Sequence, residues 1–205
     1  DFDTIASFES DKGAVGGTTI GAIGEPVGLQ RVVSDHAGGA FMVLDLGATI
    51  GLRHAEARDG TVAITDALFT WQGAADDVVV VGATADAGNH VRVLIKEGYP
   101  GGATSIRLLH FDAALTLVDE RPLPWVGELA TQFDGVSLIL TDGGPLRVAA
   151  DGSVGPVRAL GGSLYPGLGV VSRGIAPTFD GFVIAYERSD ESGRYLVWGH
   201  ADRFG

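Results

Sequence analysis

The sequence FDGVSLIL at residues 133–140 recurs 46 residues later as FDGFVIAY at residues 179–186. In each copy an Asp-Gly turn leads into a run of large apolar and β-branched residues, which is typical of a strand entered from a tight turn. A similar Gly-Gly-Ala segment at residues 38–40 precedes the apolar run Phe41–Leu44. The chain therefore contains a repeated unit of turn and strand.

A second recurring segment indicates the length of this unit. ARDGTV at residues 57–62 is matched by AADGSV at residues 149–154, which lies 92 residues, or two units, later. Aspartates in turns of this kind recur with a mean spacing of about 48 residues: Asp59, Asp112, Asp151 and Asp202. A period of 40–50 residues that holds about four short strands is typical of the blades of a β-propeller. The 205 residues accommodate four such units.

The 32 glycines are scattered along the whole chain, which indicates many tight turns and hence many short strands. The longest stretch without Gly or Pro, Ala103–Arg121, fits either one helix or two strands. Two strands that break near Asp112 are favoured, because an Asp turn recurs at equivalent places. The sequence thus predicts an all-β protein.

The fourth unit reaches Gly205 just after its Asp turn, so its outer strand is missing. Residues 18–29 resemble the segments expected to form outer strands in earlier units, Leu115–Trp125 and Val154–Leu160. We expect residues 18–29 to pair beside Arg194–Gly199, which would close the sheets into a ring and remove two exposed edges.

The predicted fold is therefore an all-β, four-bladed β-propeller closed by an N-terminal strand. Residues 18–205 form one domain in this prediction, with residues 18–29 completing the last blade, and residues 1–17 form a tail or a packing strand. Two alternatives remain open. One is a β-sandwich whose hairpins share turn chemistry, and the other is a fragment of a larger propeller.

The composition argues against several classes of function. A formal net charge of −12 argues against a nucleic-acid partner, because phosphate binding needs an excess of Lys and Arg on one face. The absence of cysteine excludes disulfides, thiolate metal sites and cysteine nucleophiles. No apolar run approaches the ~18 residues needed to cross a bilayer. No secretory signal is visible, and the chain begins at Asp1 as a processed protein would.

No catalytic or metal-binding motif stands out in the sequence. The five histidines lack the short spacings of metal ligands, and no segment has the alternating carboxylates of a calcium loop. The nearest match to a nucleophile elbow, Gly161–Gly167, has the wrong spacing. A glycosidase carboxylate pair cannot be chosen among 26 acidic residues. We therefore nominate no catalytic residue, no metal ligand and no cofactor.

Six residues are candidates for ligand binding instead. In a propeller the inner strand of each blade lines an axial channel. Four polar residues fall near the ends of the expected inner strands: Asp35, His36, Gln132 and Arg173. Side chains there would meet a small ligand or an ion, and converging backbone groups could hold an axial ion without any side-chain motif. Trp125 and Tyr165 could stack on a sugar or pack between blades.

The segment SGRYLVW at residues 192–198, together with FDGFVIAY at residues 179–186, resembles repeats of secreted bacterial β-propeller proteins. In those repeats an Asp-Gly turn, an apolar strand and a Gly-x-Tyr-Leu-Val-Trp-like strand follow one another. The resemblance implies an extracellular, cell-surface or periplasmic location and a binding or scaffolding role. It carries over no functional residue.

The expected function is that of a non-enzymatic binding or interaction module whose partner is a protein or a glycan surface. The acidic composition is expected to serve solubility. Two alternatives are a carbohydrate-active enzyme on a propeller scaffold and a structural subunit of a surface assembly.

Overall fold

The computed structural model of the chain describes residues 9–10, 13–14, 28–45, 49–59, 61–67, 75, 77–124, 127–141, 144–157, 169–190 and 193–202. These residues form strands, turns and bends, and none of them lies in a helix. In this part of the chain there is consequently no helix long and apolar enough to cross a membrane. The expectation of an all-β chain is confirmed.

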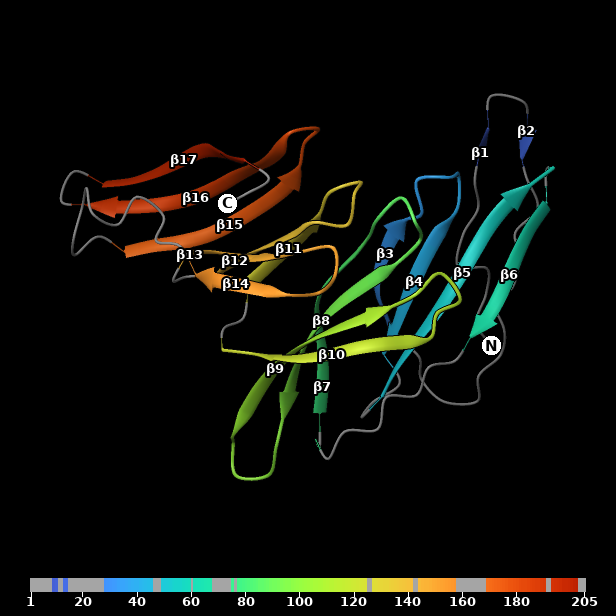
Figure 1. Ribbon diagram of the computed structural model, residues 1–205, viewed down its shortest axis with the longest axis horizontal. Coiled ribbons are helices and arrows are strands. Elements are labelled where there is room, and N and C mark those ends of the chain that lie inside the picture. Colours follow the sequence, from blue (N-terminus) through green and yellow to red (C-terminus); the bar gives the residue numbers. More distant parts are fainter. Residues whose placement is uncertain are drawn as a thin grey trace.

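Four antiparallel sheets follow one another along the chain (Figure 1). The first sheet consists of β3 (Gly28–Ser34), β4 (Ala40–Asp45), β5 (Ile50–Arg58) and β6 (Thr61–Ala67). The second sheet consists of β7 (Asp77–Ala85), β8 (Val91–Gly98), β9 (Thr104–Phe111) and β10 (Leu117–Leu123). The third sheet consists of β11 (Gly127–Thr131), β12 (Ser137–Thr141), β13 (Gly144–Val148) and β14 (Val154–Val157). The fourth sheet consists of β15 (Gly169–Pro177), β16 (Gly181–Asp190) and β17 (Gly193–Asp202). A short hairpin of β1 (Glu9–Ser10) and β2 (Gly13–Ala14) precedes them.

Within each sheet the strands pair in the order in which they occur in the chain. Short turns join consecutive strands into antiparallel neighbours, and the repeated Asp and Gly residues supply these turns. Ala103–Arg121 accordingly divides into β9 and β10 around Asp112, as expected. Asp59 and Asp151 also follow the third strand of their sheets, and Asp202 ends β17. The repeat in the sequence is thus one sheet.

The four sheets are arranged as a row. The first strands of successive sheets lie side by side, β3 beside β7, β7 beside β11, and β11 beside β15. In Figure 1 the row runs from the first sheet at the right to the fourth sheet at the left. The first and fourth sheets therefore lie at opposite ends.

The expected pairing of residues 18–29 with the last sheet is not seen in the described residues. Gly28 and Leu29 pair instead with Asp45 and Leu44 of β4, which makes them part of the first sheet. Residues 18–27 lie outside the described part of the chain. Among the described strands, β17 pairs with β16 alone. The coarse prediction of four all-β units is confirmed, and the described residues do not close into a ring.

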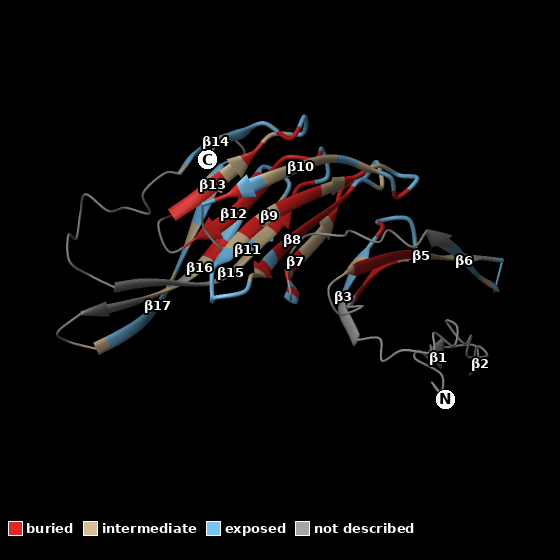
Figure 2. Ribbon diagram, turned by 90° about the horizontal axis from the view of Figure 1, so that it is seen from below, coloured by how far each residue is buried: buried red, intermediate tan, exposed pale blue. Residues whose placement is uncertain are grey.

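Apolar side chains fill the space between successive sheets. In β8, Val91 and Val93 belong to the core between the first and second sheets, whereas Leu94 belongs to the core between the second and third. In β12, Ile139 faces the second sheet and Leu140 faces the fourth. Side chains alternate between the two faces of a strand, so a strand covered on both faces has a continuous apolar sequence. Figure 2 shows this burial in the middle strands of the row.

Candidate functional site

The turn between the first and second strands, called the first turn below, recurs in every sheet. The four first turns are Asp35–Gly39, Asp86–His90, Gln132–Val136 and Thr178–Gly181. In each, the backbone N–H of the first residue donates to the carbonyl of the last, at 2.7–3.2 Å. Contacts between successive first turns, described below, place all four along one edge of the row.

The backbone of these turns explains the glycines of the repeat. The fourth residue has a positive φ in the first three turns, with values of 98° at Gly38, 63° at Asn89 and 87° at Gly135. Only Gly, and to a lesser extent Asn, adopts this left-handed conformation at little cost. The Gly of the Phe133-Asp134-Gly135 segment therefore completes a turn whose geometry most side chains would strain.

Asp35 stabilises the first turn of the first sheet through its side chain. Its Oδ1 accepts the backbone N–H groups of Ala37, at 2.8 Å, and Gly39, at 2.7 Å. Its Oδ2 lies 2.8 Å from Nε2 of His54 on β5. Burial by itself raises the pKa of Asp35, but the hydrogen bonds from His54 and the two amides outweigh burial and lower that pKa below its ordinary value.

His54 is buried, and its ring face and both ring nitrogens contact other side chains. The ring of Phe41 stacks on it with 4.2 Å between the centroids. Its Nδ1 lies 3.4 Å from Oε1 of Glu56, while Nε2 contacts Asp35. Both ring nitrogens thus face carboxylates. This buried Asp–His pair holds the turn against the third strand.

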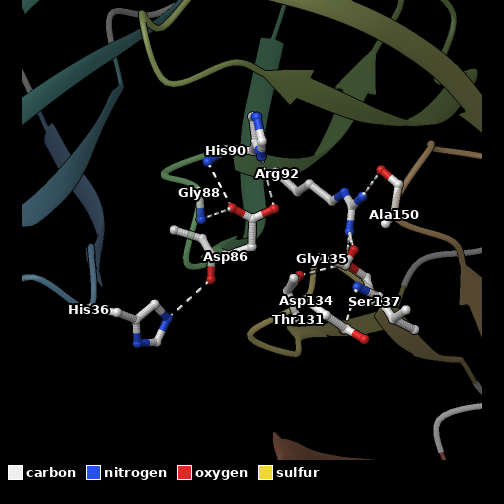
Figure 3. Close-up of polar contacts among 12 residues, drawn as sticks. His36, Asp86, Gly88, His90, Arg92, Thr131, Asp134, Gly135, Ser137 and Ala150 are labelled. Carbon is white, nitrogen blue, oxygen red and sulfur yellow. Dashed lines mark hydrogen bonds and ion pairs between the residues drawn. The ribbon is translucent and has the colours of Figure 1, made fainter.

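The second sheet has a related arrangement around Asp86 (Figure 3). Asp86 Oδ1 accepts the backbone N–H groups of Gly88, at 2.8 Å, and His90, at 3.0 Å. Asp86 Oδ2 lies 3.0 Å from Nδ1 of His90. The ring of His110 on β9 stands edge-on to that of His90, with 5.8 Å between the centroids. Burial lowers the pKa of His110, and the positive charges of Arg92 and His90 lower it further.

Arg92 links the second sheet to the third. The residue is only 2% exposed, and its guanidinium donates to the carbonyl of Gly135 and to the hydroxyl of Ser137 (Figure 3). The same group donates to the carbonyls of Ala149 and Ala150, both at 3.1 Å. A planar guanidinium has enough donors to satisfy several acceptors at once, which an apolar side chain in this place could not do.

Two further side chains connect neighbouring first turns. His36 Nε2 lies 3.3 Å from the carbonyl oxygen of Ala85, so that nitrogen carries the proton and donates from the first sheet to the second. Gln132 Nε2 donates from the third sheet to the carbonyls of Thr178, at 3.0 Å, and Gly181, at 3.1 Å, in the fourth. Together with Arg92, these contacts fix the edge of first turns across all four sheets.

This edge carries exposed aromatic side chains. Phe133 is the second residue of the first turn of the third sheet and is 72% exposed. Phe179 holds the equivalent position in the fourth sheet and is fully exposed. His36 holds the same position in the first turn and meets Phe133 edge-on, with 5.9 Å between the ring centroids. Large apolar rings that are exposed at equivalent places on rigid turns are typical of a contact surface.

The structure brings together three of the six residues nominated from the sequence. Asp35, His36 and Gln132 all lie in first turns at this edge. Arg173 lies inside β15 rather than at its end, in the register shift between Ser172 and Gly174. Trp125 and Tyr165 lie outside the described residues.

Phe133 and Phe179 received no functional role from the sequence, although they belong to the repeated segment that indicates the fold. The position directly before Asp-Gly is the signal that could have identified them, because the second residue of such a turn points to solvent. Within the described residues, no cluster of three or more His, Asp or Glu side chains could hold a metal ion.

Comparison with known proteins finds similarity among solved structures, at low sequence identity. No family model and no curated protein matches the sequence. Among solved structures, a protein of unknown function from Bacteroides caccae is similar over 86% of this chain, with 10% sequence identity and a TM-score of 0.43. The matched region spans 61% of the length of that protein.

Proposed function

We propose that this chain is a non-enzymatic interaction module built from β-propeller-type blades, and that its edge of first turns binds a protein ligand. The observation that carries this proposal is the pair of exposed rings, Phe133 and Phe179, at equivalent positions of neighbouring turns. The resemblance of the repeats to those of secreted bacterial proteins supports a location outside the cytoplasm.

The arrangement of the sheets supports the blade assignment. Each unit is an antiparallel meander, the first strands adjoin one another, and the faces of successive sheets pack together. Blades of a propeller share these three properties. The loops at one end of such an arrangement come from every unit, so they form a continuous surface for a partner.

The chemistry of the edge favours a protein segment that carries apolar and basic side chains. Phe133 and Phe179 are exposed apolar anchors on hydrogen-bonded turns, so binding them requires little ordering of the backbone that carries them. Asp134 and Asp180 follow them directly, and the chain as a whole carries a net charge of −12. These negative charges would attract Lys or Arg side chains placed beside the anchor residues of the ligand.

Selection from a displayed library of random peptides tests the proposal. We expect selected peptides to combine aromatic or aliphatic residues with Lys or Arg. Their affinity should fall about tenfold or more in Phe133→Ala and in Phe179→Ala. Both rings are exposed, so neither substitution should change the free energy of unfolding by more than about 0.5 kcal/mol.

A matched control is Val118→Ala on β10, which removes an exposed apolar side chain (54% exposed) away from the first turns. This variant should bind the peptides like the parent protein. Peptides that bind the Phe133→Ala, Phe179→Ala double variant equally well would contradict the proposal. Binding to a glycan array with no selectable peptide would instead favour a glycan ligand.

A further inference from the structure

His110 on β9 lies at the junction between the second and third sheets, close to the edge of first turns. It follows two residues after Leu108, whose side chain belongs to the apolar core of that junction, so both side chains point toward the third sheet. Its partner in register on β8 is Arg92. The ring of His90, in the first turn of the second sheet, meets the ring of His110 edge-on. The imidazole of His110 therefore stands between the edge of first turns and the apolar core.

A proton on His110 would lack a partner in these surroundings. Its Nε2 is buried and has no hydrogen-bond partner among the described residues. Two carboxylates are near, Asp119 as its register partner on β10 and Asp86 in the first turn. Both are already bonded elsewhere, because Asp119 accepts from Nε of Arg121 and Asp86 accepts from two turn amides and from His90. A charged imidazole at this place would be buried without an ion pair.

The positive charge of Arg92 adds repulsion to this desolvation. The guanidinium of Arg92 is buried between the sheets and donates to four acceptors of the third sheet. Asp86, together with the exposed Asp151 of the third sheet, offsets part of its charge. Burial, and after it the charges of Arg92 and His90, lower the pKa of His110. The junction as it stands therefore requires a neutral His110.

The position of Phe133 depends on the same contacts. Arg92 donates to the carbonyl of Gly135 and to the hydroxyl of Ser137, which follow Phe133 in its turn and at the start of β12 (Figure 3). The backbone N–H of Ala87, in the first turn of the second sheet, donates to the carbonyl of Phe133 at 3.2 Å. A change at Arg92 would thus reach an exposed aromatic ring of the edge through two residues.

We propose that His110 is an acid-sensitive switch for the edge of first turns: its protonation repels Arg92, weakens the hydrogen bonds to Gly135 and Ser137, and displaces Phe133 from the second sheet. The effect on the junction is independent of any ligand, whereas an effect on ligand binding rests on the proposed function.

The direction of the pH dependence follows from the lowered pKa of His110. The folded chain binds this proton less readily than the unfolded chain, whose histidines titrate near the ordinary value of about 6.5. The stability associated with a neutral His110 is therefore complete above about pH 6.5 and is lost as the pH falls through the lowered pKa. The junction between the second and third sheets should loosen over that interval.

An NMR titration of the 205-residue chain from about pH 8 to about pH 5 tests the switch. The ring protons of His110, assigned by their disappearance in His110→Gln, should titrate with a midpoint below about 6.5. The backbone amides of Gly135 and Ser137 should shift with the same midpoint, because Arg92 carries the effect to them. These amide shifts should be absent in His110→Gln. The control His200→Gln, which removes a histidine from the fourth sheet, should retain them.

Peptides selected for binding to the edge provide a second readout. The parent protein should bind them roughly fivefold or more weakly at about pH 5 than at about pH 7.5, and His110→Gln should lose most of this difference. A midpoint for His110 at or above about 6.5 would overturn the proposal. So would amides of Gly135 and Ser137 that do not respond, or that respond equally in His110→Gln. If no peptide can be selected, the proposed function fails, and the NMR titration still decides whether His110 controls the junction.

Discussion

Replacing Arg92 by Met should weaken the junction between the second and third sheets. Met retains much of the apolar stem but has no donor, so the acceptors on Gly135, Ser137, Ala149 and Ala150 lose their charged partner. Four hydrogen bonds at about 1 kcal/mol each give a loss of ~4 kcal/mol. The variant also avoids burying a cation, which lowers the expected net loss to about 2–3 kcal/mol.

Arg92→Ala should cost roughly 2 kcal/mol more, because it also removes the buried stem and leaves a cavity. Arg31→Met is a suitable comparison. Arg31 is exposed and donates to the carbonyl of Val81 across the junction between the first and second sheets, at 3.0 Å. Its replacement should cost less than about 1 kcal/mol.

Urea unfolding measures these differences. The midpoint should shift with an unchanged slope if the native and unfolded states bury similar areas in each variant. If the free energy of unfolding of Arg92→Met lay within about 0.5 kcal/mol of the parent value, the reasoning would be refuted, since the hydrogen bonds from the guanidinium to the four acceptors would then add no stability.

Two further predictions concern the first turns. The pKa of Asp35 is lowered in the folded protein. The stabilising effect of the Asp35 carboxylate is therefore present above the ordinary carboxyl pKa and is lost as the pH falls through the lowered value. The urea midpoint of the parent protein should drop more on acidification than that of Asp35→Asn, and parallel pH profiles of the two midpoints would contradict this. A β-carbon at Gly181 would collide with the carbonyl oxygen of Ala201, whereas one at Gly199 would meet nothing within 4 Å. Gly181→Ala should thus lower the thermal midpoint of unfolding by several degrees, and Gly199→Ala should not. Equal midpoints for the two variants would show that β17 shifts to make room.

The strands and their order could be predicted from the sequence because turn chemistry is local. An Asp-Gly segment such as Asp134-Gly135 specifies a backbone conformation by itself, and its recurrence specifies the repeat. The four first turns were harder to align, since their first residues are Asp35, Asp86, Gln132 and Thr178. Different side chains meet the same backbone requirement there. Arg173 was predicted near the end of an inner strand, whereas that strand continues to Pro177 and its first turn begins at Thr178.

The contacts between sheets could not be predicted. Arg92 reaches acceptors that lie 43 to 58 residues away, and three of the four are backbone carbonyls. Every residue has a backbone carbonyl, so the sequence does not show which carbonyls accept these hydrogen bonds. The exposure of Phe133 was missed for a different reason, because hydrophobicity alone does not distinguish a residue inside the core from one that points outward from a turn.

The arrangement of the sheets in a row affects how the protein comes apart. Each apolar core belongs to two successive sheets. Among the described residues, the core that holds the fourth sheet contains fewer buried side chains than the one that joins the first two. In such a linear array the free energy of unfolding is approximately a sum of contributions from single sheets and from the interfaces between neighbouring sheets. Opening therefore begins at a terminus and advances inward, and the fourth sheet should exchange its amide hydrogens earlier than the β8 and β9 strands at the centre.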